Sequence, residues 1–223
     1  MALWAAPAAG QSENVVSPQL WVDYNPSWRV TPRFEIYGDV GARTELESGG
    51  WRRFVVRPSV RYQLHRDVRL MGGLGNFVTV NDVIANRWEV RPWQGVNVTW
   101  PRAPVHFEHF LRFEEQFDFN TRTWESQSSL RGRYRLRTVI QWSALRQDRY
   151  WRLLASVEGF LTLAGEQGQF REQFRFSVGV ERSHRAGVRT RFDATWQREG
   201  RLFVEGSIND LFLRVRLFTS FGG

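Results

Sequence analysis

The chain has 223 residues, of which 42% are hydrophobic and 24% charged, and its 31 basic and 23 acidic residues give a net charge of +8. This length fits one barrel or domain better than two. No apolar run reaches the roughly 18 residues that a membrane-spanning helix needs, which excludes a helical membrane protein. Cysteine is absent, which excludes disulfide frameworks and thiolate metal sites.

Every basic residue is an arginine, because the sequence contains no lysine. The guanidinium group forms planar, bidentate pairs with carboxylates and therefore suits enclosed ion pairs. A strongly basic chain often binds nucleic acid, but those proteins gather their charges in a patch. Here the arginines alternate with apolar residues, so we expect no nucleic-acid partner.

The first residues, 1–12, include small side chains suited to an Ala-x-Ala cleavage site, but they lack a basic start and a long apolar core. We interpret this segment as a signal-peptide remnant or a disordered start. Residues 13–223 are predicted to form a single domain.

In that domain apolar and polar residues alternate with a period of two, which is the period of a β-strand. In chain order, strands are predicted over 20–28, 34–43, 54–63, 68–80, 88–100, 105–117, 126–142, 151–161, 174–181, 188–197 and 211–221. The connections alternate between tight turns and longer polar loops, as in outer-membrane barrels. Glycines 72, 73 and 75 predict a bend or a close side-chain neighbour.

The clearest alternation covers residues 130–137, where every second residue is an arginine. Soluble strands average about 5–6 residues, whereas a tilted membrane-crossing strand needs about 9–11. Most of the predicted strands are of the longer kind. We therefore predict an all-β fold, a single antiparallel transmembrane β-barrel of about 10–12 strands with up-and-down topology. Because single-chain bacterial barrels have an even number of strands, we expect ten, with the first segment outside the wall, or twelve.

Tryptophans lie near the ends of the predicted strands, where two aromatic girdles would meet the two membrane interfaces. The predicted girdle residues are Trp28, Trp51, Trp88, Trp100, Trp124, Trp142, Trp151 and Trp196.

The polar faces of the strands should line the lumen of the barrel. We predict a luminal ion-pair network of Glu35, Asp39, Arg57, Arg61, Arg91, Glu108, Arg112, Glu114, Arg131, Arg133, Arg135, Arg137, Glu158, Arg175, Glu181 and Arg189. Hairpin registers predict these cross-strand pairs: Asp39 with Arg57, Glu35 with Arg61, Arg91 with Glu114, Arg133 with both Glu108 and Glu158, and Glu181 with Arg189. The lumen should be narrow and filled largely by these pairs, with small or intermittent conductance that favours anions.

Catalysis or metal binding would need histidine beside suitable partners. His106 shares a polar face with Glu108, but two ligands on one strand fall short of the three or four that a metal site requires. Ser126, Ser128 and Ser129 are expected near the opposite end of that hairpin. We therefore predict no catalytic residues, no metal site and no cofactor.

Five short segments carry a resemblance to a known family: 109–117, 131–135, Arg57-Pro58, Phe174-Arg175 and 213–217. They resemble bacterial outer-membrane β-barrels catalogued as a domain of unknown function, and the resemblance covers nearly the whole chain after residue 12. It implies a barrel in the Gram-negative outer membrane and brings no assigned activity. Many such barrels end on an aromatic residue that assists insertion by the barrel-assembly machinery. Phe221 matches that pattern, although Gly222 and Gly223 follow it.

The expected partners are outer-membrane lipid, lipopolysaccharide and that assembly machinery. Two roles fit this reading: a small anion-biased, porin-like pore and a structural protein of the envelope. The alternatives are an outer-membrane lipid-modifying enzyme, which would use His106 or a nearby serine, and a soluble β-barrel binding protein.

Overall fold

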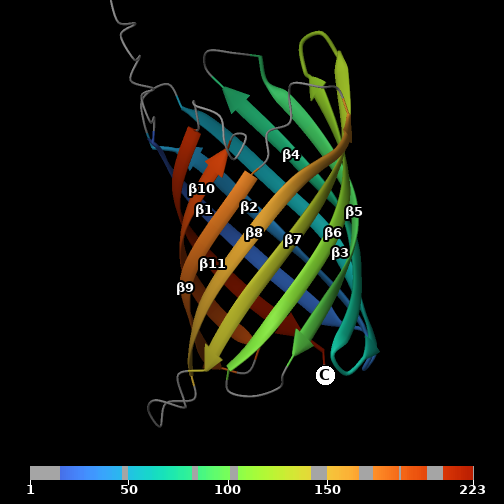
Figure 1. The fold of residues 1–223 in the computed structure, drawn as a ribbon, viewed down its shortest axis with the longest axis vertical. Helices are drawn as coiled ribbons and strands as arrows, with labels where there is room; N and C mark the ends of the chain where they lie inside the picture. The colour runs from blue at the N-terminus through green and yellow to red at the C-terminus, as the bar shows by residue number, and fades with distance from the viewer. Residues whose placement is uncertain are drawn as a thin grey trace, which may run out of the picture.

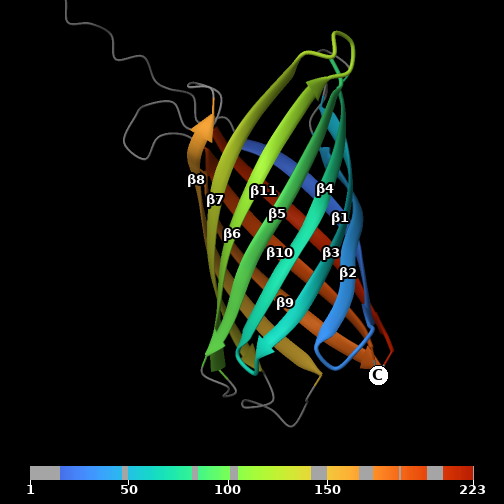
Figure 2. The same cartoon turned by 90° about the vertical axis from the view of Figure 1, so that its right-hand side faces the viewer.

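The chain forms a closed β-barrel in the computed structural model, which describes residues 16–46, 50–81, 85–100, 105–141, 150–165, 173–185, 187–199 and 208–222 (Figures 1 and 2). Within these ranges there are eleven strands: β1 (Val16–Arg29), β2 (Phe34–Glu45), β3 (Trp51–His65), β4 (Val68–Asn81), β5 (Arg87–Trp100), β6 (Val105–Asn120), β7 (Ser126–Gln141), β8 (Trp151–Gly165), β9 (Gln173–Arg185), β10 (Val188–Glu199) and β11 (Ile208–Phe221). No helix in these ranges is long and apolar enough to cross a membrane.

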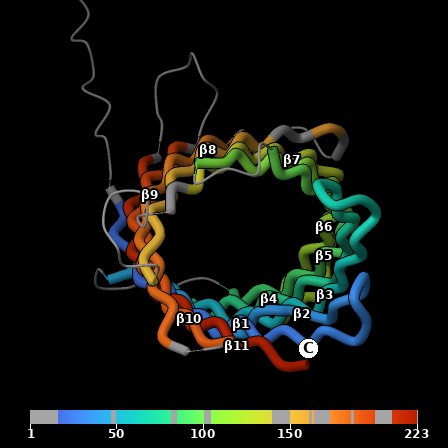
Figure 3. Tube along the Cα trace, turned by 90° about the horizontal axis from the view of Figure 1, so that it is seen from below, coloured from blue at the N-terminus to red at the C-terminus, as the bar shows by residue number. Residues whose placement is uncertain are grey.

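Each strand pairs antiparallel with its chain neighbour, so the predicted all-β, up-and-down barrel is confirmed. The prediction of an even strand number was wrong. The first segment lies in the wall, as β1, and pairs with both β2 and β11. Because eleven strands alternate in direction, β1 and β11 run the same way, and they close the ring as a parallel pair from Val16↔Asn209 to Trp28↔Phe221 (Figure 3).

The two ends of the barrel differ in their connections. At the turn end, residues 30–33 join β1 to β2, and residues 66–67 join β3 to β4; β11 also ends here, where the C-terminus is marked (Figure 1). At the loop end, segments such as 46–50 and 121–125 join the strands, and they are longer than these two turns, whereas the segment 142–150 between β7 and β8 is a long connection at the turn end.

Glycine permits the close packing of the wall at one predicted position. A Cβ added to Gly73 would lie 2.4 Å from the Ser59 hydroxyl and 2.9 Å from the Trp93 ring nitrogen. These side chains come from β3 and β5, the two strands that flank β4. The close side-chain neighbour expected for this glycine is therefore confirmed.

The outward face of the wall is apolar around the whole ring. Among the described residues, 37 large hydrophobic side chains are exposed on the isolated barrel. They are contiguous across strands because apolar residues meet in register, as in Val40↔Val56, Val96↔Leu111 and Leu20↔Leu213. The inward face carries the buried charges instead, which inverts the usual arrangement of a soluble barrel.

Candidate functional site: an arginine-lined lumen

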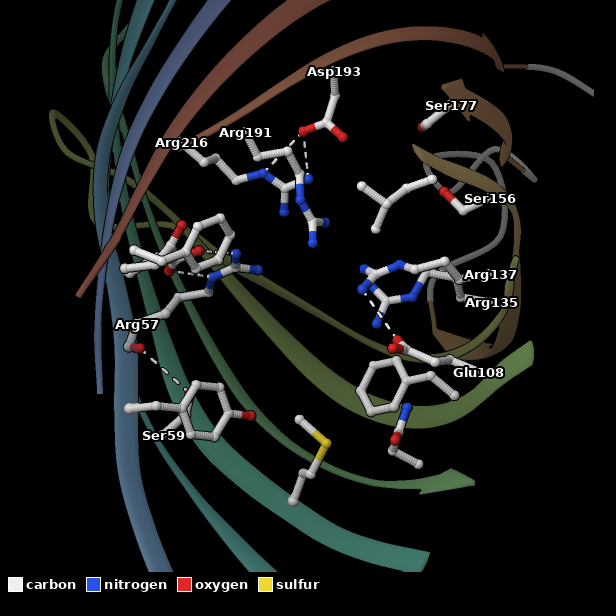
Figure 4. A pocket seen from close by; sticks show the side chains of 18 of the residues that line it. Arg57, Ser59, Glu108, Arg135, Arg137, Ser156, Ser177, Arg191, Asp193 and Arg216 are labelled. Carbon is white, nitrogen blue, oxygen red and sulfur yellow. Dashed lines mark hydrogen bonds and ion pairs between the residues drawn. The ribbon is translucent and has the colours of Figure 1, made fainter. Parts of the chain in front are cut away.

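A cavity of about 580 Å³ occupies the barrel interior, and all eleven strands contribute to its lining. Thirteen arginines and five carboxylates line it. The arginines reach the interior because their strands alternate strictly, so one face of each strand carries charge and the other apolar groups. Figure 4 shows some of these side chains, among them Arg57, Arg137 and Arg216, pointing from the wall into the cavity.

The four alternating arginines of β7 all point inward. Glu158 on β8 is the counter-ion for two of them, with N–O distances of 2.5 Å to Arg133 and 3.4 Å to Arg135. Arg175 on β9 approaches the same carboxylate at 3.8 Å. Arg137 instead pairs with Glu108 on β6, at 3.1 Å. One carboxylate therefore serves three guanidinium groups in the middle of the lumen.

A second shared carboxylate lies nearer the turn end. The Glu181 side chain is fully buried, and Arg191 and Arg189 approach it at 2.7 and 3.2 Å. Arg152 on β8 forms a third ion pair with it. Two strands, β8 and β10, thus contribute three arginines to a single buried glutamate on β9.

Five further ion pairs lie along the wall, and four of them connect neighbouring strands. These pairs are Arg57 with Asp39, Arg61 with Glu35, Arg112 with Glu114, Arg214 with Asp23, and Arg216 with Asp193. They couple β2 to β3, β1 to β11, and β10 to β11, while Arg112 and Glu114 are both on β6. Each pair supplies the counter-charge that an enclosed arginine needs.

Toward the loop end, aromatic and guanidinium groups pack against one another inside the lumen. We call this layer the plug, and its members are Trp21, Arg43, Phe77, Phe160, Arg175 and Phe212. The Trp21 and Phe212 rings stack with centroids 4.0 Å apart. The Arg43 guanidinium lies 3.9 Å from the Trp21 ring, and that of Arg175 lies 4.7 Å from the Phe160 ring.

The plug is tightly buried: Phe77 is 2% exposed and Phe212 is 3% exposed. Arg43 links Phe77 to Trp21, and Arg175 links Phe212 to Phe160, so these cation–π contacts involve six strands. Three members of the plug, Trp21, Arg175 and Phe212, also line the cavity, so the plug bounds the cavity on its loop-end side.

Of the sixteen predicted luminal residues, twelve line the cavity. The other four are Arg91, Glu114, Arg131 and Glu181, and all four have inward-facing polar contacts. The registers Asp39↔Arg57 and Glu35↔Arg61 match those expected.

Four other expected registers were wrong, three of them by two residues and one by four. Glu114 faces Trp93 instead of Arg91, although the two side chains still approach diagonally to 3.6 Å. Glu108 faces Arg137 instead of Arg133, and Glu158 faces Arg135. Likewise Glu181 faces Arg191 instead of Arg189. Even-numbered slips keep each face in place, so the hydrophobic pattern does not distinguish among them.

The sequence reasoning missed much of the lumen. The missed charged residues include Asp23, Arg43, Asp193, Arg191, Arg214 and Arg216, and the missed aromatics include Trp21, Phe77, Trp93, Phe110, Phe160 and Phe212. For the charges a signal was present, because Arg214 and Arg216 alternate with apolar residues as the β7 arginines do.

Most of the predicted girdle tryptophans lie at the ends of the barrel. Trp28, Trp100 and Trp151 lie at the turn end; Trp88, Trp124 and Trp196 lie on the loop-end side. Trp28, Trp100 and Trp124 are more than half exposed. Trp51 differs, because alternation along β3 puts it on the inward face near Arg53. Trp142, like the predicted segment 1–12, lies outside the described residues.

The histidine and serine candidates are far apart in the fold. His106 lies at the turn end, 3.8 Å from Glu108, whereas Ser126 and Ser128 pair with the opposite end of β6. His109 faces outward and hydrogen-bonds the Tyr134 hydroxyl at 2.8 Å. Within the described ranges, no group of three or more potential ligand side chains is arranged to hold a metal ion.

Searches among curated proteins and among solved structures found no significant match. The family model described as "Protein of unknown function (DUF2490)" matches residues 18–202, which run from β1 to beyond β10. The match spans most of the chain and agrees with the resemblance to a family catalogued as a domain of unknown function. The chain therefore belongs to this family of proteins of unknown function.

Proposed function

We propose that this protein is a β-barrel of the Gram-negative outer membrane, with a narrow lumen that favours anions. The observation that carries the proposal is the apolar outward face, which continues around the ring while the charges point inward. A soluble monomer rarely exposes a contiguous apolar patch larger than a few hundred Å². Lipid-facing and lumen-facing residues alternate in this way in membrane barrels.

Strand length supports the same proposal. The strands have 12 to 16 residues, and a tilted strand needs about 9–11 to cross the hydrocarbon layer. The exposed tryptophans near both ends would sit at the two interfaces, where the amphipathic indole ring is favoured. Outer-membrane barrels have short turns on the periplasmic side and longer loops on the outer side, so we expect the turn end of this barrel to face the periplasm.

The expected partners follow from these surfaces. The apolar face would contact lipid and the lipid portion of lipopolysaccharide. Phe221 is exposed at the end of β11 and would be available to the barrel-assembly machinery during insertion.

The charge of the lumen supports a preference for anions, because arginines outnumber carboxylates in its lining. We expect the buried plug to obstruct the lumen near the loop end, so conductance should nevertheless be small or intermittent. The two proposed roles, a small pore and a structural protein of the envelope, would thus be distinguished by how often the plug opens.

Electrophoresis after membrane extraction tests the location. The folded barrel should migrate differently in SDS before and after boiling, and it should require detergent for extraction. A protein that is soluble without detergent would contradict the proposal. Planar-bilayer recording then tests the lumen: small anion-biased currents are expected, and a large, steady, cation-selective pore would contradict a filled and basic lumen.

A further inference from the structure

We infer that the lumen cavity is a binding site for a small organic anion carrying two or more phosphate or carboxylate groups, which enters and leaves at the turn end. This inference deepens the proposed function and rests on it only for assigning the turn end to the periplasm. The binding chemistry itself depends on the cavity.

The first argument is the excess of positive charge. Thirteen arginines and five carboxylates line the cavity. Three more carboxylates, those of Asp23, Glu114 and Glu181, pair with lining arginines but are not part of the lining themselves. Five positive charges therefore remain in excess within a low-dielectric wall. Such an enclosed excess repels itself and attracts multivalent counter-ions.

The second argument is the placement of the arginines. Figure 4 shows Arg191 and Arg216 reaching into the cavity from one wall and Arg135 and Arg137 from the opposite wall. Guanidinium groups present several N–H donors in a fixed fork that matches phosphate and carboxylate oxygens. Because like charges face each other across the space, a ligand with anionic groups at both ends could bridge the two walls. A monovalent ion could neutralise only one of them.

The third argument is unused donor capacity at the cavity wall. The Nε atoms of Arg133 and Arg135 are buried and lack a hydrogen-bond partner. Both side chains line the cavity. Buried donors are nearly always satisfied in native proteins, and the oxygens of a bound phosphate or carboxylate would accept from them.

The shape of the cavity determines how a ligand reaches these groups. A second cavity of about 390 Å³ lies at the turn end and shares Ser27, Arg61 and Arg189 with the main one. The plug bounds the cavity on the opposite side. A volume of about 580 Å³ falls within the range of small-molecule sites, roughly 300–1,000 Å³. Access through the end of the barrel favours a water-soluble anion over a lipid headgroup.

Calorimetry on the detergent-solubilised protein tests this inference, with inorganic tripolyphosphate as the probe. We expect saturable binding of one anion per barrel. The double variant R137Q/R216Q should weaken binding by roughly tenfold or more, because two charge-assisted contacts are lost. The matched control R52Q/R122Q removes two exposed arginines outside the cavity and should leave binding unchanged. No binding by the wild type, or an equal loss in both double variants, would overturn the inference.

One further variant and one further ligand distinguish the remaining explanations of a binding result. If R137Q/R216Q does not fold, the single variant R137K retains the charge but loses the fork, and it should bind with intermediate affinity. Short-chain phosphatidic acid tests the lipid source, and tighter binding of it than of tripolyphosphate would overturn the assignment to a soluble anion. Since calorimetry in detergent needs no bilayer, a failure to bind and a failure to insert into membranes are separate results.

Discussion

Arg133 and Glu158 form an ion pair of 2.5 Å although neither faces the other across the strands. In the β7–β8 register Arg133 faces Phe160, and Glu158 faces Arg135. The diagonal contact leaves Glu158 close to Arg135 and Arg175 as well. One carboxylate can therefore hold arginines from β7 and β9 together, which makes it a central structural element of the lumen.

Replacing Glu158 with glutamine should destabilise the barrel. The variant keeps the side-chain volume but deprives three arginines of their shared counter-charge. We expect the free energy of unfolding to fall by about 3–5 kcal/mol, or less where water reaches the pair. Urea unfolding in detergent micelles measures this change. The control E125Q alters an exposed loop carboxylate and should change stability by less than about 0.5 kcal/mol.

Replacing Arg133 with alanine should have a smaller effect on stability. Glu158 keeps Arg135 and Arg175, and Glu108 keeps Arg137, so no carboxylate loses all its partners. The loss of one luminal positive charge should nevertheless reduce the preference for anions. The reversal potential in a salt gradient across a planar bilayer measures this preference. An R133A barrel less stable than E158Q would contradict the shared-carboxylate account.

The parallel closure of β1 on β11 can be tested with cysteines, since the natural chain has none. Val22 and Val215 are direct neighbours in this pair. We expect the double variant V22C/V215C to form a disulfide on mild oxidation, because neighbouring positions bring the Cβ atoms within bonding reach. Mass spectrometry of a tryptic digest identifies the linked peptides.

The matched control for this cross-link is V22C/L213C. Leu213 faces Leu20, so this pair lies two residues out of register and should cross-link poorly. A barrel of ten strands with β1 outside the wall would leave both variants unlinked.

Much of this fold can be predicted from the sequence, because alternation along a strand indicates which side chains point into the barrel and which point outward. In β7 the first three arginines are each followed by an apolar residue or glycine, namely Gly132, Tyr134 and Leu136, and a period of two assigns each residue to a side. Such a pattern places residues inward or outward whatever the register. It therefore predicted the barrel and the luminal position of most of the network.

Register and lumen filling could not be predicted in the same way. A slip of two residues moves Glu108 from Arg133 to Arg135, and a slip of four moves it to Arg137, without turning any face over. Only the packing of whole strands selects the observed pair, Glu108↔Arg137. The plug was missed because Trp21 is apolar and such residues were assigned outward. Its alternation with Gln19 and Asp23 marks it as inward-facing.

A side chain at Gly73 should prevent correct closure of the wall. In G73V the new Cβ would meet the Ser59 hydroxyl at 2.4 Å and the Pro58 carbonyl oxygen at 2.6 Å. Neighbouring backbone has little room to move, so we expect the heat-sensitive folded band in SDS electrophoresis to disappear. At Gly159 an added Cβ meets nothing within 4 Å, and G159A should fold normally. A folded G73V barrel would show that β4 can shift away from β3.

The final prediction concerns the plug and compares two tryptophans of β1. Trp21 is 5% exposed and stacks on Phe212, whereas Trp28 is 58% exposed at the turn end. Removing the Trp21 ring also takes away the surface on which the Arg43 guanidinium lies. We therefore expect W21A to open the layer between the cavity and the loop end, at a cost of about 3–5 kcal/mol in stability.

Planar-bilayer recording distinguishes this outcome from simple destabilisation. W21A should give larger and steadier currents than the wild type, still biased toward anions, because the arginines of the cavity remain in place. W28A removes a ring of the same size from the outward side of the same strand and should keep the small wild-type currents. If the plug closes the lumen, only the inward substitution changes conductance. Equal currents in W21A and the wild type would mean that the ion path is closed elsewhere or does not pass the Trp21–Phe212 stack.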